Sequence, residues 1–161
     1  MKTKQLYIFL FLAAAIFRLL VHYQDTLVPG INGGYYLVQI RSILENGQLG
    51  FPDFPLYFYF LAGLTQLGMW CTSAPVEIVS VHVVKIVDSL ALPLSILPLY
   101  YLLKNEGLSL FQQAVIVIFV LFSFSAMMML GDFQKNAFGI PFLFGVVYYG
   151  KAYLVEAKSS V

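Results

Sequence analysis

The stretch LFQQAVIVIFVLFSFSAMMML, residues 110–130, decides the fold class of this chain, because it is long, apolar and free of charged side chains. A helix needs about 20 mostly apolar residues to cross the hydrocarbon core of a bilayer. Backbone N–H and C=O groups inside lipid must pair within their own segment, which favours a helix over an open strand. The stretch therefore predicts a membrane-spanning helix.

The composition of the whole chain also indicates a membrane environment. Of its 161 residues, 60% are hydrophobic and only 11% are charged, whereas about a quarter of the residues in soluble domains are charged. A soluble chain this short could not bury so much apolar surface. The net charge of +1, without a basic patch interleaved with aromatics, argues against a nucleic-acid partner. Cys71 is the single cysteine, which excludes an intrachain disulfide and a cysteine-based metal cluster.

Further apolar segments surround this stretch, and they extend the prediction to a multi-pass protein. They are residues 6–21, 56–71, 76–103 and 137–155. The second is short, and the third is long and contains Pro93 and Pro98. We predict an all-α transmembrane bundle of four or five spans that forms a single domain over residues 1–161. The number is four if 56–71 dips into the bilayer and returns, and five if it crosses.

The lysines predict the orientation of the bundle in a cell membrane, either the plasma membrane or an inner membrane. Lys2 and Lys4 precede the first apolar segment, so the positive-inside rule places the N-terminus in the cytoplasm. A cleaved signal peptide is the rival interpretation, but Arg18 lies inside the apolar run and no typical cleavage site follows it. Lys104, Lys151 and Lys158 favour a cytoplasmic turn and C-terminus, which fits four spans and an external Asp132.

The longest polar interval, residues 22–55, predicts an amphipathic helix at the membrane interface. Tyr36, Ile40, Ile43 and Leu44 recur at helical spacing, with polar side chains on the other faces. Asn32 is a favoured residue at a helix start, and Gly47 is suited to the left-handed position after a helix. The run FPDFP at 51–55 then forms a rigid aromatic turn. On these features alone the interval is an anchor whose aromatics lie at headgroup depth.

The same interval resembles the first external loop of GT-C glycosyltransferases, a group that includes protein mannosyltransferases, lipid A aminoarabinose transferases and oligosaccharyltransferases. The resemblance rests on PGINGGYY at 29–36, QIRSIL at 39–44 and Gly47. GDFQKN at 131–136 stands where that group has its next acidic residue, at the end of a hydrophobic span. The similarity covers residues 18–149 but only the N-terminal half of the group's longer chains. It therefore implies an incomplete domain: a truncated product, a degenerate copy, or one half of an assembly that a second chain completes.

The resemblance implies a polyprenyl-phosphate sugar donor and transfer on the non-cytoplasmic side of the membrane. An acid of the first loop would serve as a base or help to hold a divalent metal, and basic residues would hold the lipid phosphate. Asn32 falls at the position of that acid, and an amide cannot act as a base. The candidate catalytic residues are therefore Asp132, which matches the second acidic position, with Asp25, Asp53 and Asn32. The candidate substrate-binding residues are Arg18, Arg41, Tyr36 and Lys135, and no metal ligands are identified.

Several of these charges also have simpler interpretations. Arg18 can snorkel to the interface. Asp132 and Lys135 have the spacing of a local ion pair at a helix start. Lys85 and Asp88 lie three residues apart in an apolar segment, which predicts a neutralising pair on one helix.

The leading functional hypothesis is a GT-C-like glycosyltransferase or a fragment of one. If it holds, Asp132, Arg41, Arg18 and either Asp25 or Asp53 line one cavity near the outer surface. The alternative is a non-catalytic membrane subunit or a degenerate remnant. A small transporter module comes third, because most acids lie at helix ends rather than within facing spans.

Overall fold

The computed structural model describes residues 3–104 and 106–159, which form helices joined by loops, with no strand in those ranges. The α-helices are α1 (Thr3–His22), α2 (Gly33–Asn46), α3 (Pro55–Thr72), α4 (Val76–Ala91), α5 (Ile96–Leu103), α6 (Leu110–Phe122), α7 (Phe124–Met128) and α8 (Gln134–Ser159). A 3-10 helix, η1 (Pro93–Ser95), joins α4 to α5. The predicted all-α class is confirmed.

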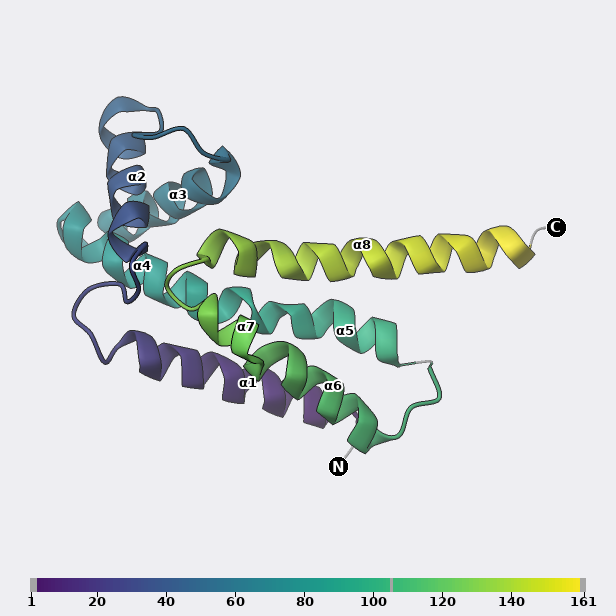
Figure 1. Ribbon diagram of the computed structural model, residues 1–161. Coiled ribbons are helices and arrows are strands. Elements are labelled where there is room, and N and C mark those ends of the chain that lie inside the picture. The colour runs from purple at the N-terminus through teal and green to yellow at the C-terminus, as the bar shows by residue number, and fades with distance from the viewer. Residues whose placement is uncertain (1–2, 105, 160–161) are drawn as a thin grey trace.

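Four helical segments within the described ranges are long and apolar enough to cross a membrane. They are Thr3–His22, Val76–Leu103, Leu110–Met128 and Gln134–Leu154. The segment 56–71, which the sequence left open, forms α3 and is not among these four. Figure 1 shows α1, α5, α6 and α8 lying roughly along one common axis, with both chain ends at the same end of the bundle. The protein is therefore a multi-pass helical bundle.

Proline and serine interrupt two of the spans. Pro93 starts η1, which separates α4 from α5, whereas Pro98 lies in the first turn of α5 and leaves that helix intact. Ser123 has an extended backbone between α6 and α7, and its side chain accepts a hydrogen bond from the Ala126 N–H. Both breaks leave the segments on either side in the same span.

The amphipathic helix predicted from the interval 22–55 is α2, which lies across one end of the bundle (Figure 1). Tyr36, Ile40 and Ile43 are buried against α3 and α4, as their spacing predicts. Gly47 ends the helix with a φ of 73° and donates its N–H to the Ile43 carbonyl at 2.9 Å. Its position across the spans is the one expected of a helix in the membrane interface.

Two hydrophobic cores hold the structure together. One joins α1, α4, α6 and α7 along the bundle, and it includes Leu10, Val117 and Leu121. The other joins α2, α3 and α4 at the end of the bundle, around Ile40 and Phe58. Phe138 of α8 packs against both clusters. The loops that precede α2 and α8 are therefore held where the two cores meet.

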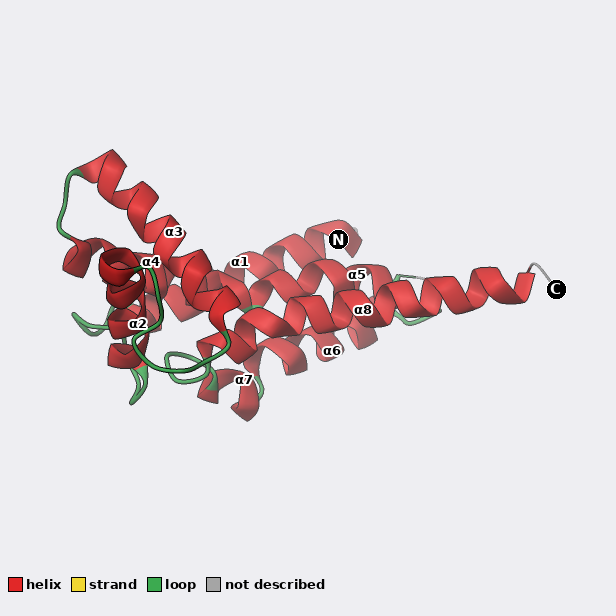
Figure 2. Ribbon diagram, turned by 90° about the horizontal axis from the view of Figure 1, so that it is seen from above, coloured by secondary structure: helices red, strands yellow, loops and turns green. Residues whose placement is uncertain are grey.

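The helix α8 differs from the other spans because most of its apolar side chains are exposed, although it packs against α4 and α5. Only 6% of its apolar window is buried, compared with 50% for Val76–Leu103. Figure 2 shows α8 extending beyond the other spans at its C-terminal end. The predicted span 137–155 begins three residues earlier, at Gln134. That start places the beginning of α8 within the polar end of the bundle.

Candidate functional site: the junction of two loops

Two loops that are far apart in the sequence nest against each other where the cores meet. Residues 29–32 precede α2 and residues 130–133 precede α8, and we call the pair the loop junction. Gly30 has a φ of 90° and Gly131 a φ of 84°, which disfavours any residue with a Cβ. A Cβ on Gly131 would lie 2.3 Å from the Pro29 carbonyl oxygen, and one on Gly30 would lie 2.5 Å from Asp132 Oδ1. The approach of the two loops therefore requires glycine on both sides.

Asn32 and Asp132 contact each other directly at this junction. The Asn32 N–H donates to Asp132 Oδ1 at 2.9 Å, and Asn32 Nδ2 donates to the Asp132 carbonyl oxygen at 3.2 Å. Asn32 occupies the position before α2 that the sequence predicted, but its side chain makes no capping hydrogen bond. The Asn32 side chain instead bonds to the opposite loop. The two positions that the resemblance singled out as acidic are thus neighbours.

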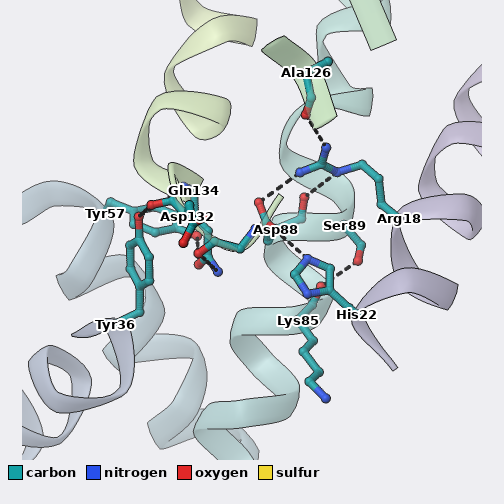
Figure 3. Close-up of polar contacts among 11 residues, drawn as sticks. Arg18, His22, Tyr36, Tyr57, Lys85, Asp88, Ser89, Ala126, Asp132 and Gln134 are labelled. Atoms are coloured by element: carbon teal, nitrogen blue, oxygen red, sulfur yellow. Dashed lines mark hydrogen bonds and ion pairs between the residues drawn. The ribbon is translucent and has the colours of Figure 1, made fainter. Parts of the chain in front are cut away.

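Tyr36 holds the backbone of the Asp132 loop in place (Figure 3). Its hydroxyl donates to the Asp132 carbonyl oxygen at 3.1 Å and accepts from the Gln134 N–H at 3.1 Å. Burial raises the pKa of Tyr36 to about 12. The hydroxyl therefore keeps its proton at neutral pH and stays a donor. Tyr57 adds a second contact by donating to Gln134 Oε1 at 3.2 Å.

Lys135 pairs with Asp53 beside the junction rather than with its neighbour Asp132, so the interpretation of Lys135 as a local partner of Asp132 is wrong. Its Nζ lies 2.8 and 2.7 Å from the two carboxylate oxygens of Asp53. Tyr35 donates to the same carboxylate at 2.8 Å. Partial burial raises the pKa of Asp53, but hydrogen bonds from Lys135, Tyr35 and the Phe54 N–H outweigh it and hold the pKa below its usual value.

Gln39 is a structural residue of this region that the sequence pattern assigned to a polar face. Its side chain is fully buried. Oε1 accepts from the N–H groups of Gly50 and Phe51, at 2.8 and 3.1 Å, while Nε2 donates to the Tyr35 hydroxyl at 2.7 Å. Gln39 therefore fixes the turn that presents Asp53 to Lys135.

Beneath the junction lies a group of buried charges that we call the buried network: Arg18 and His22 of α1 with Asp88 of α4. Arg18 Nη2 lies 3.2 Å from Asp88 Oδ1, and His22 Nε2 lies 2.6 Å from Asp88 Oδ2. Arg18 Nε also donates to the Asp88 carbonyl oxygen at 3.3 Å. Asp88 is thus paired with α1. The predicted pair between Lys85 and Asp88 is wrong. Figure 3 shows these side chains converging between the two helices.

Lys85, the expected partner of Asp88, stabilises the loop after α1 instead. Its Nζ donates to the carbonyl oxygens of Asp25 and Thr26 at 2.6 and 3.2 Å and lies 4.9 Å from the centre of the Tyr23 ring. Asp25 therefore contributes a main-chain oxygen to this contact, and its side chain is exposed.

The structure thus brings some of the candidate residues together and separates others. Asn32, Tyr36 and Asp132 meet at the junction, and Lys135 pairs with Asp53 beside it. Arg41 is exposed and pairs with Glu45 at 2.7 Å and Glu77 at 3.5 Å. It lines a groove of about 300 Å³ between α2 and α4. Arg18 is buried below the junction and points at Asp88.

The resemblance implies that an acid of the first loop could help to hold a divalent metal, so the acidic and other ligand side chains matter here. Among the residues that the structure describes, no group of three or more His, Cys, Asp or Glu side chains is arranged to hold a metal ion. The carboxylates nearest the junction are instead bound to N–H groups and Lys135. The described side chains therefore do not fit a metal site, and we derive no step through a metal.

Comparison with known proteins returned no relative. No family model, no curated protein and no solved structure matches this chain.

Proposed function

We propose that this chain is a membrane glycosyltransferase of the GT-C type, or a part of one, that uses a polyprenyl-phosphate sugar on the non-cytoplasmic side of the membrane. The observation that carries the proposal is the direct contact between Asn32 and Asp132. These residues stand at the two acidic positions that the resemblance assigns to the reaction centre. A chance similarity of two loops would not require them to meet.

Asp132 is the residue of this junction that can act as a general base. Its Oδ1 is held by the Asn32 N–H, whereas Oδ2 has no hydrogen bond with any residue that the structure describes. Oδ2 can therefore accept the proton of an acceptor hydroxyl as that oxygen attacks the sugar and the lipid phosphate departs. Asn32 cannot take a proton, so its contribution is to orient the carboxylate of Asp132.

The surroundings of the junction suit a substrate whose phosphate lies at headgroup depth. Ile31 is 96% exposed and Phe54 is 84% exposed, on the two loops that flank α2. Large apolar side chains of this kind insert at a membrane interface. Lys135 is only partly buried by its contact with Asp53. Its ammonium group can therefore still meet a lipid phosphate from the aqueous side.

A second candidate function, a non-catalytic membrane subunit or remnant, is favoured by a different observation. The three cations that would hold the phosphate already have carboxylate partners inside the chain. Arg18 pairs with Asp88, Arg41 with Glu45 and Lys135 with Asp53. In this role the polar loops would only anchor and pack.

Sugar transfer by the purified chain distinguishes the two functions. The assay supplies a panel of polyprenyl-phosphate sugars and follows release of the lipid phosphate. Because Asp132 is the proton acceptor in this proposal, we expect turnover by the native chain and a loss of about 10²–10⁴-fold in Asp132→Asn. Asp25→Asn, which alters an exposed carboxylate, should leave turnover unchanged. A set of variants that are all inactive would favour the non-catalytic subunit.

A further inference from the structure

Burying the charged groups of the buried network costs free energy, even inside a membrane protein. Arg18 is 1% exposed, and His22 and Asp88 are fully buried. Charged side chains within spans are costly, and buried ion pairs are often no better for stability than apolar residues of similar size. Neutralising charge is therefore a weak reason for the network to exist.

The contacts of the network with the backbone suggest a more specific role. Asp88 Oδ2 accepts the N–H of Gly131 at 3.0 Å, and Arg18 Nη1 donates to the Ala126 carbonyl oxygen at 3.1 Å. One bond reaches the loop that carries Asp132, and the other reaches α7, the helix just before that loop. The bonded N–H belongs to the Leu130–Gly131 peptide, so Asp88 fixes the backbone one residue before Asp132.

The Asp132 loop is thus held from two sides. From below, the Gly131 N–H is bonded to Asp88. From above, the Asp132 Oδ1 accepts the N–H of Asn32. The close contacts at Gly30 and Gly131 leave little room for one loop to shift without the other. A movement at the lower attachment is therefore transmitted to the contact between Asn32 and Asp132.

We propose that Arg18, His22 and Asp88 are positioning residues that set the place of Asp132 through the Gly131 N–H. The importance of this role for sugar transfer rests on the proposed function, but the positioning itself does not. In this arrangement Arg18 and His22 orient the Asp88 carboxylate, and Asp88 holds the loop. Loss of the network releases Asp132 from Asn32 even when the helices remain packed.

The test separates positioning from simple charge balance. Removing Arg18 alone leaves an uncompensated carboxylate in the protein interior, which destabilises the fold for a general reason. The double variant Arg18→Leu/Asp88→Leu removes both charges and keeps the interior neutral. Lys85→Met is the matched control, because it removes a buried cation of α4 that bonds to the loop after α1.

The measurement is amide hydrogen exchange of the full chain in lipid nanodiscs, at Gly131 and at Asn32. Among the described residues, Asn32 shares no hydrogen bond with the substituted side chains, and its N–H is bonded to Asp132, so its exchange reports where Asp132 lies. We expect the double variant to exchange about tenfold faster than the native chain at both amides, since each loses a hydrogen bond to a charged group. Lys85→Met should leave both rates unchanged.

A double variant that exchanges faster at Gly131 but at the native rate at Asn32 would overturn the proposal, because the network would then act only on its own neighbour. If the double variant does not fold, the native chain still provides a test. The proposal requires Gly131 and Asn32 to open together, and a much slower exchange at Asn32 would contradict it. No substrate is present, so inactivity in sugar transfer has no bearing on the result.

Discussion

Two ion pairs lie on either side of the Asp132 loop, and their surroundings are opposite. Arg18 and Asp88 are 1% and 0% exposed, in the interior between α1 and α4. Lys135 and Asp53 are 35% and 11% exposed, at the rim where α8 begins. The inner pair cannot separate without leaving a charge in a medium of low dielectric constant. The outer pair is in contact with water, so it can open and exchange partners.

The difference shows how a small membrane bundle can use a carboxylate–cation pair in two ways. The inner pair holds the backbone of the loop from the interior of the protein. The outer pair keeps the Lys135 ammonium group accessible to a ligand at the surface. Each of the following substitutions tests one side of this contrast, in order of the expected change in the free energy of unfolding.

The largest effect is expected for Arg18→Leu, which leaves the Asp88 carboxylate buried without its main partner. Loss of one member of a buried pair costs about 3–5 kcal/mol. Arg41→Leu is the matched control, because Arg41 also pairs with a carboxylate but at the exposed surface, where such pairs contribute little to stability. Equilibrium unfolding in mixed detergent micelles measures both. Equal costs would show that the interior pair is as solvated as the surface pair.

A smaller effect is expected for Gly131→Ala. The substitution forces alanine into a left-handed backbone and places a Cβ against the Pro29 carbonyl oxygen, at a cost of about 2 kcal/mol. Gly139→Ala is the control within α8, where a Cβ would meet nothing within 4 Å. It should be neutral or stabilising by about 0.5 kcal/mol, because alanine is the better helix former. Similar costs at both positions would contradict the close approach of the two loops.

The smallest effect is expected at the rim, and it should depend on pH. Asp53 has a pKa below its usual value in the folded chain, so the stability it contributes is present above about pH 4 and is lost as the pH falls through the folded pKa. The native chain should therefore exceed Asp53→Asn by at most about 1 kcal/mol at neutral pH, and the two should converge in acid. The check is thermal unfolding of both proteins from pH 7 to about pH 3. A difference that does not change with pH would exclude a role for the Asp53 carboxylate charge.

Local patterns in the sequence predicted the helices well. The apolar runs are long enough to identify spans by length alone, and Tyr36, Ile40 and Ile43 define the buried face of α2 by their spacing. Gly47 ends that helix because the left-handed position costs glycine nothing. These features depend on neighbours within a few residues, which is why a single sequence is sufficient to find them.

The partners of the charged residues could not be predicted in the same way. The three-residue spacing of Lys85 and Asp88 suggested a local pair, but Asp88 faces α1 and binds residues more than sixty positions away. One signal was available in the sequence. Arg18 and His22 lie four residues apart on one face of a span, and a face of this kind requires an acidic partner from another helix.

The Asn32–Asp132 contact has no local signal, because the two residues lie 100 positions apart. Only the resemblance associated the two loops, and it did not predict that the Asn32 side chain would bond across the junction. The position of Gln39 was missed for a similar reason. A buried glutamine whose side chain hydrogen-bonds the backbone of a turn has the same sequence pattern as one that faces water.

The central claim is that the loops carrying Asn32 and Asp132 lie together on the outer side of the membrane. Single cysteines at Gln48 and Phe133, both exposed, test it in a Cys71→Ser background, with cysteines at Gly107 and Lys151 as controls from the opposite end. A membrane-impermeant thiol reagent applied to intact cells should label the first two sites, and should label the controls only after permeabilisation. Labelling of Gln48Cys and Phe133Cys from opposite faces would contradict the account.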